Sequence, residues 1–164
     1  MNVLGTYRVS WEAVRRLAIE CHALDSTAHR LLIDTTLDDT VGKNRIAYEE
    51  LVTEKLLALA IALRMKFYQG EDPAETASYA NGCGLLYKID GVKEEEVSFT
   101  LKDVCDKIIH ADNIDRSIAT ASDAELINLF GAEQRGGKSV PWHLGLSVTL
   151  FAQSVLNWIA IKEA

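Results

Sequence analysis

The sequence predicts a mainly α-helical protein, a bundle of four principal helices with a short β-hairpin before the C-terminal helix. Three stretches carry apolar residues at helical spacing, and a fourth, more apolar stretch lies near the end of the chain. Only two prolines and ten glycines interrupt the 164 residues. A chain of this length fits one domain with a substantial core, so residues 1–164 are expected to form a single domain.

The first predicted helix starts after Ser10, whose hydroxyl group suits an N-cap. It is expected to end before the segment 35–44, in which Thr, Asp and Gly interrupt the pattern. Its apolar residues recur at helical spacing and are Val14, Leu17, Ala18, Cys21, Leu24, Ala28, Leu31 and Leu32.

A second helix is predicted over about 44–68, and Gly70 is a natural stop after it. Because the connection to the first helix is short, the two are expected to pack as an antiparallel hairpin. The apolar face of the second helix consists of Ala47, Leu51, Val52, Leu56, Leu59, Ala60, Leu63 and Phe67.

The segment 69–99 is the least regular part of the sequence. A short helix capped by Asp72 is predicted near its start, with proline in the first turn. Further on, the pair Asp90-Gly91 could close a small hairpin, but the flanking residues alternate poorly. We therefore favour a surface loop that carries the acidic run 94–96.

The third helix is predicted to begin at the N-cap Thr100 and to end near His110. Its core-facing stripe consists of Leu101, Val104, Cys105, Ile108 and Ile109. The polar residues Asp103, Asp106, Lys107 and His110 share the other side, which places His110 at the margin of the helix and outside the packing seam.

A small hairpin is predicted next. Leu126, Ile127, Leu129 and Phe130 suggest a strand, and Gly131, Gly136 and Gly137 mark a loop. The segment 140–143 returns as a second strand, which Pro141 would place at the edge of a sheet.

The last helix is predicted over 146–161. This stretch is shorter than the roughly 20 residues that cross a bilayer, and it carries several polar side chains, so no membrane span is expected. Its large apolar residues appear on too many sides to face a single core, which predicts a homodimer. These residues are Leu150, Phe151, Val155, Trp158 and Ile159.

The net charge, the cysteine spacing and the N-terminal residues argue against several classes of function. The formal net charge of −7 argues against a generic nucleic-acid binder, because such binding depends on Lys and Arg against phosphate. Cys21, Cys83 and Cys105 are widely spaced without a C-x-x-C pair, so neither a metal site nor a redox dithiol is expected, and no cofactor motif is present. The N-terminal residues lack the layout of a secretory signal, which predicts a cytoplasmic protein with reduced cysteines.

The segment 106–111 reads Asp-Lys-Ile-Ile-His-Ala and ends the third helix. It resembles the HEPN superfamily, one subgroup of which has Asn-Lys-Ile-Ile-His-Ala here, followed by a short hairpin and an apolar terminal helix. The resemblance runs over 101–111, with looser support from 129–151. It implies a small helical bundle, usually dimeric, of a bacterial toxin–antitoxin or defence system, and many such proteins are metal-independent ribonucleases.

The resemblance also implies which residues would be catalytic. Active members carry an Arg with four to six residues between it and the His, and the Arg is usually followed by a polar residue. The His exchanges protons near neutral pH, and the Arg holds phosphate. In this sequence Asp106 occupies the place of the polar residue, but Cys105 stands where the Arg is expected. Lys102 lies nearby, with seven residues between it and His110, so the motif is incomplete.

Two functional hypotheses follow. The preferred one is a non-catalytic HEPN-like binding protein, with RNA or an antitoxin as partner. The alternative is a metal-independent HEPN ribonuclease that uses His110, with Asp106 and Lys102 as helpers. A purely structural role for His110 also fits, since a His is favourable at a helix C-terminus and can pair with Asp106 one turn earlier.

Overall fold

The computed structural model describes the ranges 8–33, 38–70, 83–90, 93–96, 99–116 and 126–164. Four helices and five strands lie in the described residues. Their order is α1 (Trp11–Ile33), α2 (Asp38–Tyr68), β1 (Gly84–Asp90), β2 (Lys93–Glu96), α3 (Leu101–Ile109), β3 (Asn113–Arg116), β4 (Ile127–Arg135), β5 (Lys138–Leu146) and α4 (Val148–Glu163). The protein is mainly helical, as predicted.

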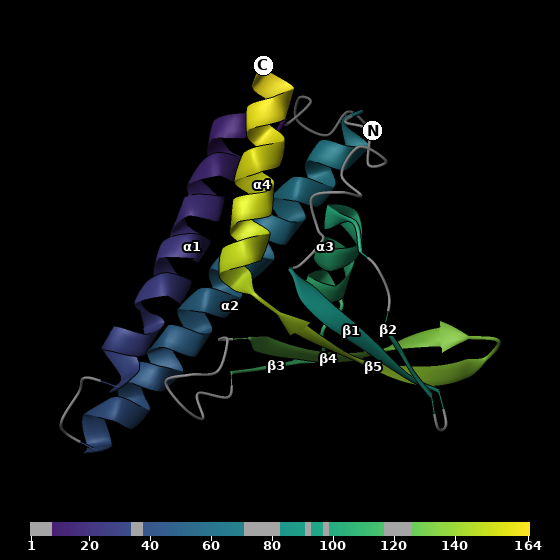
Figure 1. The fold of residues 1–164 in the computed structure, drawn as a ribbon, viewed down its shortest axis with the longest axis horizontal. Coiled ribbons are helices and arrows are strands. Elements are labelled where there is room, and N and C mark those ends of the chain that lie inside the picture. The colour runs from purple at the N-terminus through teal and green to yellow at the C-terminus, as the bar shows by residue number, and fades with distance from the viewer. Residues whose placement is uncertain (1–7, 34–37, 71–82, 91–92, 97–98, 117–125) are drawn as a thin grey trace, which may run out of the picture.

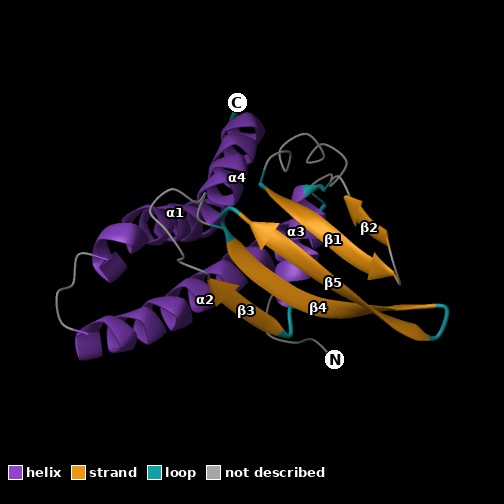
Figure 2. Cartoon of the chain, turned by 60° about the horizontal axis from the view of Figure 1, so that its bottom comes forward, coloured by secondary structure: helices purple, strands orange, loops and turns teal. Residues whose placement is uncertain are grey.

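The three long helices form one side of the molecule. Helix α1 packs against both α2 and α4, and α2 packs against the short α3 (Figure 1). Helices α1 and α2 form the predicted hairpin. The sheet lies beyond α3 and has the strand order β2-β1-β5-β4-β3, with every neighbouring pair antiparallel. Figure 2 shows α3 behind this sheet.

One core connects the helices with the inner face of the sheet. Strand β4 contributes Ile127 and Leu129, which alternate with more exposed residues as expected for a half-buried strand. The ring of Trp158 lies 5.2 Å from the ring of Trp11 and 5.2 Å from that of Phe67, centroid to centroid, so α4 is fixed against α1 and α2 by aromatic packing.

The hairpin before the last helix is confirmed. Strands β4 and β5 pair from Ile127↔Leu146 to Arg135↔Lys138, and Gly136 and Gly137 turn the chain with φ of 54° and 80°. Gly131 lies inside β4 and not in the loop. A Cβ atom there would overlap the Trp142 ring, which explains the glycine.

The sheet is larger than predicted, and two expectations about it are wrong. The stretch with the acidic run 94–96, for which we favoured a surface loop, is instead the β1–β2 hairpin, which pairs from Tyr87↔Glu96 to Asp90↔Lys93. Strand β5 is central and not at an edge. Its pairing with β1 stops at Lys88↔Trp142, so Pro141 lies just beyond that ladder, where its missing N–H costs no hydrogen bond. The short helix expected after Asp72 lies outside the described residues.

Two helical details also differ from expectation. Helix α2 begins at Asp38, earlier than the predicted 44, and Ala47 and Leu51 of its predicted core face are exposed. The premise for a dimer through α4 fails, because four of the five large residues are buried within one chain; these are Phe151, Val155, Trp158 and Ile159. Only Leu150 of that set is exposed. None of the described helices is both long and apolar enough to cross a bilayer.

Candidate functional site

Helix α3 is fixed at both ends, which sets the positions of the predicted site residues. At its start, the Thr100 hydroxyl accepts from Asp103 N at 3.1 Å, and Asp103 Oδ2 accepts from Thr100 N at 2.9 Å, a capping box. At its end, His110 is the C-cap, and its backbone N donates to Asp106 O at 3.0 Å. The predicted stripe packs into the core, with Leu101, Val104, Cys105 and Ile108 buried. Lys102, Asp106 and His110 are therefore spaced one turn apart along the outer side.

Asp106 joins α3 to α2 through a residue that sequence reasoning missed. Its Oδ1 atom lies 3.0 Å from Nε of Arg64, which extends from α2, and its Oδ2 atom lies 3.3 Å from Nζ of Lys102. Arg64 also donates from Nη2 to the Tyr68 hydroxyl at 2.7 Å. We call Arg64, Tyr68, Lys102, Asp106 and His110 the α2–α3 cluster.

No pattern within α3 points to Arg64, because its contact with Asp106 depends on how two helices pack. The available signal was its position on α2, on the same helical face as Ile61 and Tyr68 and beside the predicted core stripe. An expected packing of the second helix against the third would have suggested it. The guanidinium group that α3 itself lacks at Cys105 is thus supplied from α2, next to Asp106.

The imidazole of His110 stands apart from this ion-pair network. His110 is exposed, as predicted, and its side chain makes no hydrogen bond or ion pair with the part of the chain that the structure describes. Lys107, which also lies on the outer side of α3, is directed elsewhere: its Nζ lies 3.1 Å from Glu133 Oε2 and 4.5 Å from the centre of the Trp142 ring. The cluster therefore has two cations around one carboxylate and an imidazole at its margin.

The cysteine thiols are enclosed in the protein. None of the three forms a disulfide, and all three are buried. Burial, the largest cause, raises the pKa of the Cys105 thiol and raises that of Cys21 to about 12. A thiol with a raised pKa stays protonated near neutral pH and is a poor nucleophile. The prediction that Cys105 lies on the core-facing stripe of the third helix is confirmed.

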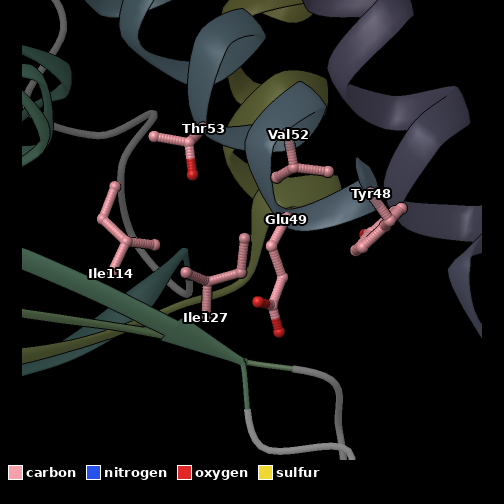
Figure 3. Close-up of a pocket in the computed structure, with 6 residues that line it drawn as sticks. All are labelled: Tyr48, Glu49, Val52, Thr53, Ile114 and Ile127. Carbon is pink, nitrogen blue, oxygen red and sulfur yellow. The ribbon is translucent and has the colours of Figure 1, made fainter. Parts of the chain in front are cut away.

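A small pocket lies away from the cluster, between α2 and the strands β3 and β4 (Figure 3). Ile114 and Ile127 face Val52 and Thr53 across it. Its remaining lining residues are Tyr48 and Glu49, and none of the predicted site residues contributes to it. Within the described ranges, no three His, Cys, Asp or Glu side chains lie close enough to hold a metal ion.

Two further polar residues of the β4–β5 hairpin make local contacts. His143 Nε2 lies 2.9 Å from Asn128 Oδ1, and the His143 ring stacks on the Phe130 ring with centroids 4.7 Å apart. Arg135, at the glycine turn, pairs with Glu133 at 2.7 Å. Comparison of the chain with family models, with curated proteins and with solved structures found no match.

Proposed function

We propose that this protein is a non-catalytic HEPN-like binding protein and that the α2–α3 cluster is its binding surface. A place in a bacterial defence or toxin–antitoxin system belongs to the same proposal, as the resemblance implies. A homodimeric state and a cytoplasmic location are also part of the proposal. Three cysteines that form no disulfide are compatible with the reducing conditions of the cytoplasm.

The observation that carries this proposal is the position of Asp106 between Arg64 and Lys102. Cleavage of a phosphodiester needs a group that transfers a proton and a cation that stabilises the developing negative charge. The two cations of the cluster, Arg64 and Lys102, share the carboxylate of Asp106, which offsets their charge where a phosphate would have to bind. A phosphate group would have to displace Asp106 from Arg64 and Lys102 before these cations could stabilise its charge. The arrangement therefore favours the binding of a partner over catalysis.

The chemistry of the surface favours a protein partner, such as an antitoxin, over RNA. The chain has a net charge of −7, and RNA would have to compete with Asp106 for both cations. Tyr68, 78% exposed, and Arg64 lie side by side in the cluster, with the guanidinium carbon 4.9 Å from the ring centre. Tyr and Arg are the residue types that most often dominate protein interfaces.

The test is incubation of the purified full chain with single-stranded RNA in EDTA. We expect no cleavage above background, and the same result for His110→Ala. Cleavage that disappears in His110→Ala would refute the non-catalytic proposal.

A second candidate function, a metal-independent ribonuclease, is favoured by one observation. Arg64 brings a guanidinium group to Asp106, which lies one helical turn before His110, and Lys102 contacts the same carboxylate. If this candidate holds, Arg64→Ala and His110→Ala both abolish RNA cleavage in EDTA. Arg45→Ala is the matched control, because Arg45 also lies on α2 and pairs with a carboxylate, Glu49, at 2.8 Å. Equal cleavage by all four proteins would exclude a role for the cluster in catalysis.

A further inference from the structure

Helix α2 carries two lines of regularly spaced residues, only one of which faces the core. The buried line consists of Val52, Leu56, Leu59, Leu63 and Phe67. A second line, which we call the outer seam, consists of Glu50, Glu54, Leu57, Ile61, Arg64 and Tyr68. Its spacing alternates between four and three residues, which is the spacing of the a and d positions of a coiled coil.

The middle of the outer seam is apolar and open to solvent. Leu57 is 37% exposed and Ile61 44% exposed, and both lie in the centre of a long helix. An amphipathic helix that packs on one core needs only one apolar face, so two adjacent aliphatic positions on its other side call for a reason. Both side chains keep more than a third of their surface exposed, so the seam is suited to packing against another helix.

Charge is distributed unevenly along the seam. Its N-terminal part carries the exposed carboxylates of Glu50 and Glu54, and its C-terminal part carries Arg64 and the Tyr68 hydroxyl. Lys102 lies beside Arg64, so the C-terminal part has two cations around the single carboxylate Asp106. After Asp106 is counted, the C-terminal part keeps one net positive charge against the two carboxylates of the N-terminal part, so the two halves attract each other in a two-fold symmetric interface.

We propose that a second copy of this chain docks on the outer seam, with the two α2 helices antiparallel. In this register Leu57 packs against the partner's Ile61, and Glu54 faces the partner's Arg64. Glu50 then faces the partner's Tyr68. Each layer pairs a d position with an a position, as in antiparallel coiled coils. A parallel pair would instead place Glu50 and Glu54 against their own copies, and the like charges would repel.

This inference rests on the homodimer part of the proposed function and deepens it by naming the interface. Ten residues separate positions 54 and 64, so the two Arg64 residues would lie about 15 Å apart along the helices. Arg64 and Tyr68 of each α2–α3 cluster would then lie in the interface, and Lys102, Asp106 and His110 of both clusters would border it. Whether that border cleaves RNA is a separate question, which the assays above address.

The first experiment measures the mass of the full chain by sedimentation over a range of concentrations. We expect a dimer that Leu57→Glu or Ile61→Glu weakens at least about tenfold, because each places a carboxylate in the apolar centre. Ile19→Glu on α1 and Leu150→Glu on α4 are matched controls, since both replace exposed apolar residues on other helices. A monomer at every concentration, or a dimer broken by either control and not by the seam variants, would overturn the proposal.

The second experiment tests the antiparallel register by disulfide cross-linking. In the proposed dimer, position 50 lies opposite position 68 of the partner, while two copies of either position lie about 27 Å apart along the helices. The double variant Glu50→Cys with Tyr68→Cys should therefore form cross-linked dimers on oxidation, and neither single variant should. The native cysteines are buried and should not contribute. Cross-linking of a single variant would overturn the register. A dimer with this register that does not cleave RNA leaves the inference standing, and cleavage abolished by His110→Ala refutes the non-catalytic function alone.

Discussion

Two helix interfaces in this molecule are each joined by an aspartate, and they differ in what surrounds it. Between α1 and α4, Asp25 is only 3% exposed, and its Oδ2 atom accepts from Thr149 N at 3.1 Å and from Thr149 Oγ1 at 2.6 Å. Between α2 and α3, Asp106 is partly exposed and binds two cations. The first carboxylate has neutral donors at a helix N-terminus, and the second has two charged side chains, of which Lys102 is the more exposed.

The difference indicates which interface is built for stability. Asp25 binds the second residue of α4, while Ser147 caps the same helix by accepting from Leu150 N at 3.3 Å. Asp25 Oδ2 and Ser147 Oγ thus accept hydrogen bonds from two backbone N–H groups in the first turn of α4. The N-terminus of a helix also favours a nearby negative charge. Asp106 satisfies no backbone group of α2, and solvent screens its ion pairs. Substitutions at the two interfaces should therefore have very different consequences for folding.

The largest effect is expected in the core of the α1–α4 interface. Trp158→Ala removes a fully buried side chain between Trp11 and Phe67 and leaves a cavity. The free energy of unfolding should fall by about 3–5 kcal/mol, measured by urea denaturation. A loss below about 1 kcal/mol would show that this interface does not hold the bundle together.

Asp25→Ala should rank second. It leaves the Thr149 N–H and hydroxyl without their acceptor in a buried place, which should cost about 2 kcal/mol in the free energy of unfolding. Asp25→Asn is the control, because it keeps one carbonyl acceptor and should lose less. Equal losses for the two variants would mean that the charge, and not the hydrogen bonds, stabilises α4.

Asp106→Ala should have the smallest effect on folding, about 1 kcal/mol, because its ion pairs are partly solvated. Lys102→Ala removes the more exposed of the two cations and should cost less still. Both can be compared in the same urea titrations. A loss for Asp106→Ala as large as that for Asp25→Ala would place Asp106 among the structural residues and weaken the case for a binding surface.

Much of the fold could be predicted from local sequence. The stripe from Leu101 to Ile108 and the cap Thr100 determine α3 by themselves, and two glycines determine the turn of the β4–β5 hairpin. The β1–β2 hairpin was missed because its strands alternate poorly and because β1 pairs with β5, a strand distant in sequence. Long-range pairing of this kind leaves little local signal.

The candidate site was predictable only in part. His110, Asp106 and Lys102 lie on one helix, so their common side followed from spacing. Arg64 comes from another helix, and only tertiary packing brings it to Asp106. The same limit explains the error about α4. A helix that is apolar on most sides can be buried within one chain, and here Trp11 of α1 and Phe67 of α2 cover the ring of Trp158.

The central proposal is that the α2–α3 cluster, with Asp106 between two cations, binds a partner and does not cleave RNA. The most direct measurement is the rate at which the purified protein degrades single-stranded RNA in a chelator, alongside His110→Ala. We predict that both rates equal that of a reaction without protein. A measurable rate that the substitution at His110 eliminates would contradict this account and establish the imidazole as a catalytic group.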